Sequence, residues 1–420
     1  MLDINYITEN KEIVIKKLLV KNFESKEIIE ELELLNKKRK IIIKELESKR
    51  SEINNISKKI GELFKEKKTQ DAVKLKEESV KIKNSFGDME SNLFNIENEI
   101  NDKILRIPNI PHDSVKNQTE NETIKEKNKK ININEESLPH WELIKKFKLV
   151  DFELGNKITG SGFPVYTNKG AKLQRSLINF FLEENIKAGY EEIIPPLLVN
   201  KESAFGTGQI PDKDEVMYHI ERDNFYLIPT SEVPVTNILR DKTLEEEKLP
   251  IKYTSYTPCF RREAGSYGKD VRGLNRIHQF DKVEIVQITN PETSYETLQE
   301  MVNHIEGILM KLELPYRILR LCGKDLSFAS SLTYDFEVYS AAQKKWLEVS
   351  SVSNFETFQS NRLNLKMKSK SKKTLCHTLN GSSLALPRIV AAMLENNQQK
   401  NKIGLPKELQ KYTGFEFIEK

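Results

Sequence analysis

Residues 257–288, TPCFRREAGSYGKDVRGLNRIHQFDKVEIVQI, combine two alternating runs with an intervening basic loop that contains glycine. This pattern predicts a β-hairpin with a long tip. Arg261 and Glu263 are two residues apart on the outgoing strand, so the two-residue period of a strand places a guanidinium and a carboxylate on one face. A cation and an acceptor on one surface suit a ligand that carries phosphate and amino groups.

The returning strand of this hairpin offers a matching set. Phe280 and Glu284 share one face, whereas Val283 and Ile285 share the other and can face a core. An aromatic ring stacks on a nucleobase and carboxylates bind amino groups, so the surface suits a nucleotide and a small zwitterion. An ordinary charged hairpin is an equally good interpretation of the pattern alone. Five loop residues are suited to close over phosphates: Gly265, Gly268, Lys269, Arg272 and Gly273.

The composition limits the class of protein without identifying a partner. A chain of 420 residues has room for two or three domains, one of them with a substantial core. Its net charge is only +4 although 31% of the residues are charged. Any basic surface for nucleic acid must therefore be local.

The cysteines and the first residues indicate a cytoplasmic protein. Three scattered cysteines, Cys259, Cys322 and Cys376, are too few for a disulfide framework and form no CxxC zinc motif. The opening MLDINYITENKEIV has no apolar core of a signal peptide, and no run approaches the about 20 apolar residues of a membrane span. We therefore expect no zinc and no membrane partner.

The N-terminal quarter carries a heptad pattern from about residue 27 to 103. A polar run at 66–71 separates two seams of similar length, which predicts an antiparallel pair of long helices. A dimerising coiled coil or one side of a bundle explains the period equally well, but the narrow apolar stripe favours a free-standing arm. The seams are Leu32, Leu35, Arg39, Ile42, Leu46, Lys49, Ile53, Ile56, Ile60 and Leu63, then Leu75, Ser79, Ile82, Phe86, Met89, Leu93, Ile96 and Ile100.

The rest of the chain divides into a linker and a second domain. The stretch IPNIPHDSV at 107–115 contains two prolines, and residues 116–138 are polar without a period. We interpret 107–138 as a linker between a helical domain at 1–106 and a second domain at 139–420.

Two charged residues of the second domain lie in unfavourable places. Glu348 interrupts a run that otherwise has the character of a buried strand, and a buried acid normally requires a partner. Residues 377–398, HTLNGSSLALPRIVAAMLENNQ, predict a strand, a glycine turn and a helix that begins near Pro387. Arg388 then opposes the helix dipole unless an anion binds there. The alternatives are a salt-bridged acid and a surface arginine.

The hairpin sequence FRREAGSYGKDVRG…HQFDKVE resembles the second signature motif of class II aminoacyl-tRNA synthetases, in the form carried by seryl-tRNA synthetases. A long helix predicted at about 170–188 and the strand predicted for EEIIPPLLV at 191–199 follow each other as in motif 1, which residues 170–196 resemble. Residues 377–398 resemble motif 3, in the same order. The resemblance implies an α+β fold, with an N-terminal antiparallel two-helix coiled-coil arm before a class II catalytic domain. That domain is built on a mostly antiparallel sheet flanked by helices.

The resemblance also implies an activity and partners. A member of this family activates L-serine with ATP to seryl-adenylate and transfers serine to tRNA(Ser); tRNA(Sec) is a further candidate acceptor. It implies a homodimer, formed through motif 1, in which the arm contacts tRNA across the dimer. The implied cofactor is Mg²⁺ bound with ATP.

The family's site residues are carried over by position, with Arg261 and Arg388 as the catalytic residues. Glu348 and Ser351 would hold the metal, although strict alternation aims them at opposite faces unless a bulge or the strand end intervenes. The implied ATP-binding residues are Arg261, Arg262, Glu263, Ile277, Phe280, Glu348, Val349, Ser350, Ser351 and Arg388. The implied serine-binding residues are Thr230, Ser231, Glu232, Arg261, Glu284, Asn380 and Ser382.

Three other functional classes are less consistent with the sequence. A repurposed RNA-binding homologue would be expected to lose motif arginines and glutamates, which are present here. An amino acid:carrier-protein ligase on the same scaffold normally lacks the arm and uses zinc. A structural coiled-coil protein leaves residues 140–420 unexplained. For the sequence Thr230-Ser231-Glu232 alone, a helix N-cap is the simpler interpretation.

Overall fold

The computed structural model describes residues 1–127, 137–211, 215–263, 272–370 and 372–420. Contacts divide the chain into two compact units. One comprises Leu2–Pro108, and the other comprises Asn109–Lys420 together with Met1.

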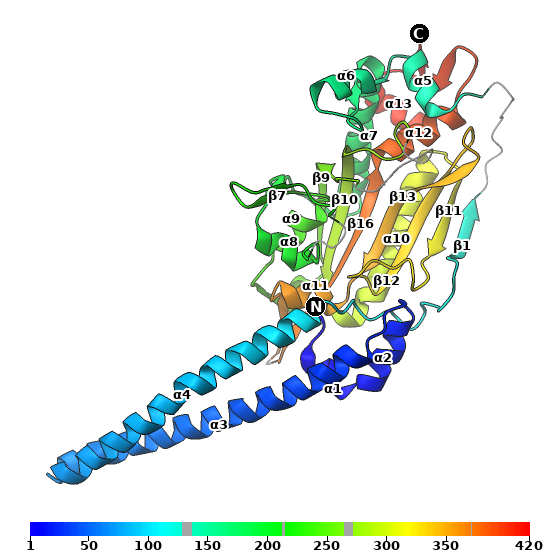
Figure 1. The fold of residues 1–420 in the computed structure, drawn as a ribbon. Coiled ribbons are helices and arrows are strands. Elements are labelled where there is room, and N and C mark those ends of the chain that lie inside the picture. The colour runs from blue at the N-terminus through cyan, green and yellow to red at the C-terminus, as the bar shows by residue number, and fades with distance from the viewer. Residues whose placement is uncertain (128–136, 212–214, 264–271, 371) are drawn as a thin grey trace. The chain divides into compact units, whose positions relative to one another are not determined.

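The first unit is helical and contains the predicted arm. Two short helices, α1 (Ile4–Glu9) and α2 (Lys11–Leu19), precede the long helices α3 (Lys26–Lys65) and α4 (Thr69–Ile104). Helices α3 and α4 lie side by side as a hairpin (Figure 1). The predicted coiled-coil pair is confirmed, but the break between the helices is only residues 66–68 because α4 already begins at Thr69.

The predicted seam residues face the partner helix of the arm. Leu32, Leu46 and Ile56 on α3 and Ile96 on α4 are buried. The two cations within the α3 seam also reach α4. Arg39 Nε lies 3.0 Å from Glu97 Oε1, and Lys49 Nζ donates to Ser85 Oγ at 3.0 Å. Polar pairs at seam positions favour one register of the two helices over its neighbours.

The second unit is built on an eight-stranded sheet with the order β1-β11-β12-β13-β16-β10-β9-β4. Every neighbouring pair is antiparallel except β4 and β9, which are parallel. The predicted α+β class is therefore confirmed. The strands are β1 (Glu122–Lys127), β4 (Glu191–Glu192), β9 (Ile251–Phe260), β10 (Gln279–Thr289), β11 (Tyr316–Arg320), β12 (Leu332–Ser340), β13 (Lys345–Asn354) and β16 (His377–Ala385).

The two faces of this sheet differ in what covers them. Helix α7 (Asn168–Lys187) packs on one face, where Asn185 Nδ2 donates to Thr254 Oγ1 at 2.8 Å. Helix α10 (Ser294–Lys311) lies beside α7, because His304 Nε2 lies 2.7 Å from Asn185 Oδ1. Helix α9 (Glu232–Asn237) packs on the other face, where Val235 joins Val286 in a buried cluster. Glu284 lies on the same face of β10 as Val286, so the side chains of the candidate site also lie on this second face.

Smaller elements complete the second unit. The further helices are α5 (His140–Lys146), α6 (Phe152–Ile158), α8 (Lys201–Thr207), α11 (Thr357–Arg362), α12 (Leu386–Asn396) and α13 (Lys407–Thr413). The further strands are β2 (Val150–Asp151), β3 (Val165–Tyr166), β5 (Leu198–Val199), β6 (His219–Ile220), β7 (Phe225–Leu227), β8 (Thr243–Glu245), β14 (Lys366–Ser369), β15 (Lys372–Leu375), β17 (Lys402–Gly404) and β18 (Phe417–Glu419).

Three local expectations differ from the structure. Strand β1 forms within the polar stretch that we interpreted as a linker, and it pairs with β11. Backbone hydrogen bonds to β11 stabilise this strand although its residues are polar. The expected strand at 191–199 is two short strands, because the prolines at 195 and 196 lack the amide hydrogens that a ladder needs.

The expected glycine turn in motif 3 is the third difference. Gly381 instead lies inside β16, paired with Ile285 on one side and Val352 on the other. A Cβ at Gly381 would lie 2.9 Å from Val352 Cγ2, so glycine permits close packing between strands here.

Candidate active site

Two adjoining cavities occupy the α9 side of the sheet. The first, here named the arginine cavity, has a volume of about 210 Å³. The second, here named the carboxylate cavity, has a volume of about 470 Å³. Arg261, Lys282, Glu348 and Ser382 line both. The arginine cavity is also lined by Glu263, Leu274, Asn275, Arg276, Ile277, Phe280, Val349, Ser350, Ala385, Pro387 and Arg388.

The hairpin of β9 and β10 positions the first side chains of the arginine cavity. Phe260 pairs with Gln279, so the predicted hairpin is confirmed. The Arg261 guanidinium lies 5.2 Å from the centre of the Phe280 ring, and its Nε donates to the carbonyl of Pro229 at 3.3 Å. Its remaining nitrogens can bind an anion in the cavity, and the Phe280 ring offers a flat apolar surface beside it.

Glu263 lines the same cavity for a different reason from the predicted one. Strand β9 ends at Phe260, and Glu263 has a left-handed φ of 48°. The turn, and not strand alternation, therefore brings its carboxylate into the cavity. Arg276 holds that carboxylate at 3.0 Å, which leaves further lone pairs for an amino group.

Arg388 lies in the first turn of α12 and points into the arginine cavity. Its Nε donates to the carbonyl of Asn275 at 3.1 Å, and its Nη1 donates to the carbonyl of Glu348 at 2.8 Å. The Glu348 carboxylate is 3.8 Å away. Arg388 is thus held across the cavity by backbone groups and is not a freely exposed surface arginine.

The carboxylate cavity is organised around buried charges on β10. Lys282 Nζ lies 2.6 Å from Glu284 Oε2 and donates to Thr230 Oγ1 at 2.7 Å. Ser382 Oγ is 3.4 Å from Glu284 Oε2, and Asn380 lines the wall nearby. The Lys282 and Glu284 side chains are only 6% and 2% exposed. Such a pair persists because each charge has a partner.

Glu232 adds a second buried acid to this cavity. Burial raises the pKa of Glu232 to about 7, and the negative charge of Glu284 contributes to the same shift. Gln359 Nε2 donates to Glu232 Oε1 at 2.7 Å and fixes the carboxyl group. Glu232 is therefore close to a proton-binding midpoint at neutral pH, which is typical of functional acids.

A β-bulge brings Glu348 and Ser351 to the same cavity. Ser350 pairs with Phe336 while Glu348 pairs with Glu337, so Val349 is the extra residue. The bulge that Glu348 and Ser351 need in order to reach the same cavity is therefore present. The expectation of a buried Glu348 is wrong, since its side chain is 51% exposed. It faces the open cavity and not the core.

Asp335, on β12 opposite Ser351, is a site residue that we did not predict. Burial and the charge of Glu348 raise the pKa of Asp335 well above its usual range. Its Oδ1 has no hydrogen-bond partner within the described residues. A hydroxyl and two carboxyl groups provide the oxygen ligands that Mg²⁺ prefers, so these residues fit a magnesium ion.

Lys282 was also missed, although it lies between Phe280 and Glu284 at the same strand parity. The two-residue period would have found it. Gln359 is on α11, far from its partner in sequence, and no local signal indicates it. Across the described ranges, no group of three or more His, Cys, Asp or Glu side chains is placed to hold a metal.

Two of the predicted site residues lie away from the cavities. Arg262 pairs with Glu215 at 3.2 Å and does not line either cavity. Ser231 is fully buried at the N-cap of α9, and its hydroxyl makes no cap hydrogen bond. Thr230 Oγ1 instead accepts from the backbone amide of Glu232 at 3.2 Å. Of the predicted loop residues, Gly265, Gly268 and Lys269 lie outside the described ranges.

Apart from the loop residues Arg272 and Gly273, which line neither cavity, the remaining predicted residues are brought together. Ile277, Val349 and Ser350 line the arginine cavity, and Ser351 lines the carboxylate cavity. The three cysteines are buried with free thiols. Among the described residues, no helix combines the length and the apolar character that a bilayer span requires.

Residues 1–111 match the family model described as "Seryl-tRNA synthetase N-terminal domain". Residues 218–397 match "tRNA synthetase class II core domain (G, H, P, S and T)". A serine–tRNA ligase of Salinibacter ruber is 47% identical over 99% of this chain and 98% of its own length. The chain belongs to the seryl-tRNA synthetase family.

Other members of the seryl-tRNA synthetase family support this assignment. The serine–tRNA ligase of Mesoplasma florum is 43% identical over 98% of both chains. The seryl-tRNA synthetase of Pyrococcus horikoshii, solved in complex with ATP, has a TM-score of 0.93 and 32% identity, covering 100% of this chain and 99% of its own. The cytoplasmic serine–tRNA ligase of Naegleria fowleri, solved with AMP, has a TM-score of 0.88 and 27% identity, covering 100% of this chain and 99% of its own.

Proposed function

We propose that this chain activates L-serine with ATP and transfers it to tRNA(Ser). The observation that carries the proposal is the junction of a cavity lined by guanidinium groups with a cavity that contains buried carboxyl groups. A polyphosphate suits the first and an ammonium group suits the second. Arg261 lines both cavities, so it lies where the two substrates would react.

The proposed activation is an in-line displacement. A serine carboxylate oxygen attacks the α-phosphorus of ATP, the new P–O bond forms, and pyrophosphate leaves with the electrons of the broken bond. Arg261 holds the α-phosphate and Arg388 holds the γ-phosphate. Phe280 stacks on adenine, and Glu263 accepts from the adenine amino group. Since little proton transfer is needed, positioning and charge stabilisation dominate.

The second step uses seryl-adenylate, the mixed anhydride that the first step forms. A terminal ribose hydroxyl of the tRNA attacks the seryl carbonyl carbon, and AMP leaves with the electrons of the anhydride C–O bond. The hydroxyl proton passes to solvent, and the products are AMP and the seryl ester of the tRNA. Transfer to tRNA(Sec) would follow the same chemistry, so tRNA(Sec) is a second acceptor to assay.

Serine selection is assigned to the carboxylate cavity. Glu284 binds the serine ammonium group, while Thr230 and Glu232 provide polar partners for the substrate. Asn380 and Ser382 lie on the adjoining strand β16 and line the same cavity, and we assign them to the serine side chain. An alanine substrate would leave buried polar groups without partners, which disfavours its binding.

Glu348 and Ser351 are assigned to Mg²⁺ bound with ATP, and Asp335 lies beside them. When bound, the ion neutralises phosphate charge during displacement. The oxygen donors of these residues support this assignment.

The arm and the dimer are proposals that rest on the family. The arm binds tRNA, and in a homodimer it would reach the tRNA aminoacylated by the partner. Exposed apolar side chains near motif 1 support a covered surface there: Ile186 is 41%, Ile194 is 85% and Leu198 is 42% exposed. Free thiols and a cytosolic substrate are consistent with a cytoplasmic location.

A survey of ATP–pyrophosphate exchange with each common amino acid tests the proposed activity. We expect serine alone to drive efficient exchange. Faster exchange with threonine, alanine or glycine would contradict the assignment of the carboxylate cavity. Absence of exchange with every amino acid, in a folded protein, would contradict activation itself.

Replacing residues 30–100 with a short flexible linker tests the arm. The truncation removes no residue of either cavity. We expect serine-dependent exchange to stay within a few-fold and most aminoacylation of tRNA(Ser) to be lost, because backbone contacts supply tRNA affinity. Equal loss of both activities in a folded truncation would count against a tRNA-binding role.

A further inference from the structure

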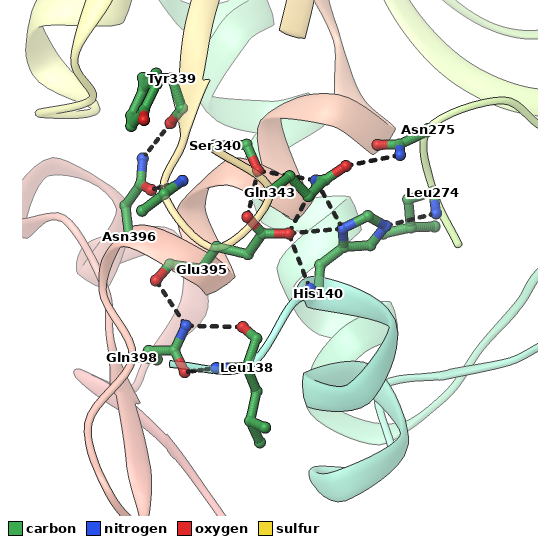
Figure 2. Close-up of polar contacts among 11 residues, drawn as sticks. Leu138, His140, Leu274, Asn275, Tyr339, Ser340, Gln343, Glu395, Asn396 and Gln398 are labelled. Atoms are coloured by element: carbon green, nitrogen blue, oxygen red, sulfur yellow. Dashed lines mark hydrogen bonds and ion pairs between the residues drawn. The ribbon is translucent and has the colours of Figure 1, made fainter. Parts of the chain in front are cut away.

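A buried histidine is the first residue of α5 (Figure 2) and contacts Leu274, which lines the arginine cavity. The side chains of His140 and Glu395 are both fully buried. His140 Nδ1 lies 2.8 Å from Glu395 Oε1, and the His140 backbone amide donates to the same oxygen at 2.9 Å. The start of α5 is thus fastened to α12, the helix that carries Arg388.

The second ring nitrogen of His140 supports the returning end of the hairpin loop. The backbone amide of Leu274 donates to His140 Nε2 at 2.9 Å. Because Nε2 accepts here, the proton of the neutral ring lies on Nδ1, where it donates to Glu395. One imidazole therefore joins a helix and a loop through two opposite atoms.

The loop fits closely against this ring. Gly273 has a φ of 66°, and a Cβ there would lie 2.4 Å from His140 Nε2. The adjacent Arg272 guanidinium lies 5.1 Å from the centre of the Trp141 ring. Consecutive residues of the loop thus rest on consecutive residues of α5, so the first turn of α5 determines where the loop returns to the sheet.

Glu395 is itself held by further donors. Ser340 Oγ donates to Glu395 Oε2, and Gln343 Nε2 donates to Glu395 Oε1 at 2.9 Å. Gln343 Oε1 then accepts from Asn275 Nδ2 at 2.9 Å. The loop end is therefore fastened twice, by the backbone of Leu274 and by the side chain of Asn275. Figure 2 shows both connections.

Asn275 connects this network to the cavity. Its carbonyl accepts from Arg388 Nε at 3.1 Å, and both Leu274 and Asn275 line the arginine cavity. A shift of this loop end would move one of the two backbone acceptors that orient Arg388. The contacts form a continuous chain from His140 through Leu274 and Asn275 to Arg388.

We propose that His140 is a positioning residue for ATP: it sets the place of residues 273–275 and, through Asn275, the orientation of Arg388. This rests on the proposed ATP-dependent activation. His140 does not line the cavity, so it acts without touching the nucleotide. The competing interpretation is a buried pair that stabilises the fold and has no specific effect on ATP.

Two substitutions at His140 separate its two hydrogen bonds. In His140→Asn the side-chain amide can still donate to Glu395, but the Leu274 amide loses its acceptor. In His140→Gln the longer side chain can still accept from Leu274, but the Glu395 contact is lost. If His140 positions the loop, the asparagine variant should raise the KM for ATP in pyrophosphate exchange by about tenfold, because one buried donor loses its acceptor.

The glutamine variant should keep the KM for ATP within about threefold of wild type, since it retains the bond to the loop. The KM for serine should be unchanged in both variants. Assays are run well below each variant's Tm, which is measured separately. A KM for ATP within twofold of wild type in folded His140→Asn would overturn the proposal.

Gln398→Ala is the matched control within the same network. Gln398 Nε2 donates to the carbonyl of Leu138 at 2.9 Å, so it fastens the residues before α5 without contacting 272–275. This variant should lower the Tm and leave the KM for ATP unchanged. An equal rise in KM for ATP here would show that general loosening is sufficient, which would also overturn the proposal.

If His140→Asn does not fold, Gln343→Ala tests the second fastening. It removes the donor to Glu395 and the acceptor for Asn275, and a two- to fivefold rise in KM for ATP is expected, about the value of one partly exposed hydrogen bond. An unchanged KM would then overturn the proposal. Wild-type exchange with serine separates this outcome from failure of the proposed function, which would abolish exchange in every variant.

Discussion

The arginine and carboxylate cavities share a wall but differ in how far their charged side chains are exposed to solvent. In the arginine cavity, Arg276 and Arg388 stay partly exposed, with side chains 47% and 28% accessible. In the carboxylate cavity, Glu284 is 2% exposed and the pKa of the buried Glu232 is raised. Under the proposed function, this difference suits two kinds of recognition: neutralising a polyphosphate, and selecting a small ligand by desolvated polar partners.

The largest effect is expected where the cavities meet. Arg261→Ala removes the guanidinium that lines both, so kcat/KM in serine-dependent exchange should fall by more than about 10³-fold. Arg262→Ala is the control, since its neighbouring guanidinium pairs with Glu215 outside the cavities. The shared-wall interpretation fails if the two variants have similar activity.

The next effect should fall on one cavity alone. Arg388→Ala should lower kcat/KM for ATP by about 10²- to 10³-fold through loss of a preorganised charged contact. The KM for serine should be nearly unchanged, because Arg388 does not line the carboxylate cavity. An unchanged exchange rate would instead favour a merely structural arginine.

A third, smaller effect should identify the metal side of the shared wall. Glu348→Gln keeps the shape of the side chain but removes its charge, so the Mg²⁺ concentration for half-maximal exchange should rise by roughly tenfold. Glu337→Gln is a suitable control, because Glu337 pairs with Arg317 and lines neither cavity. Normal magnesium dependence with lower stability in Glu348→Gln would make Glu348 a structural acid.

Part of the site could be predicted from the sequence alone. The hairpin, Phe280 and Glu284 follow from strand alternation, and the motif resemblance adds Arg388, Glu348 and Ser351. The two-helix arm follows from its heptads because its contacts are local in pattern. These features depend on short-range periods that the chain displays directly.

The remaining features depend on contacts between distant segments. Asp335 faces Ser351 only because β12 pairs with β13 in a particular bulged register. Gln359 meets Glu232 across 127 residues, and His140 meets Leu274 across 134. No local period in the sequence predicts such contacts between distant segments. Glu348 was misjudged because apolar neighbours suggest burial, whereas the exposure of a strand face depends on whether anything covers it.

The smallest predicted effect is a pH dependence that belongs to the carboxylate cavity alone. The pKa of Glu232 is raised to about 7 by burial and by the charge of Glu284. The free protein therefore holds a proton on Glu232 at pH 6 and has mostly lost it at pH 8. A negative charge favours binding of the serine ammonium, so the KM for serine should rise by up to about tenfold from pH 8 to pH 6, as a pKa near 7 requires. The KM for ATP should change much less, and Glu232→Gln should flatten the serine profile.

The free energy of unfolding should also depend on Glu232, but it should fall as pH rises, whereas serine affinity rises. Because the folded-state pKa lies above the ordinary value of 4.5, the folded protein binds the proton that the unfolded chain releases between those values. The contribution of Glu232 to stability is then fully present below about pH 4.5 and is lost as pH rises through about 7. The Tm of wild type relative to Glu232→Gln should accordingly fall between pH 5 and pH 8, while serine affinity rises. A serine profile that is identical in both proteins would place the titrating group elsewhere and remove the contrast between the cavities.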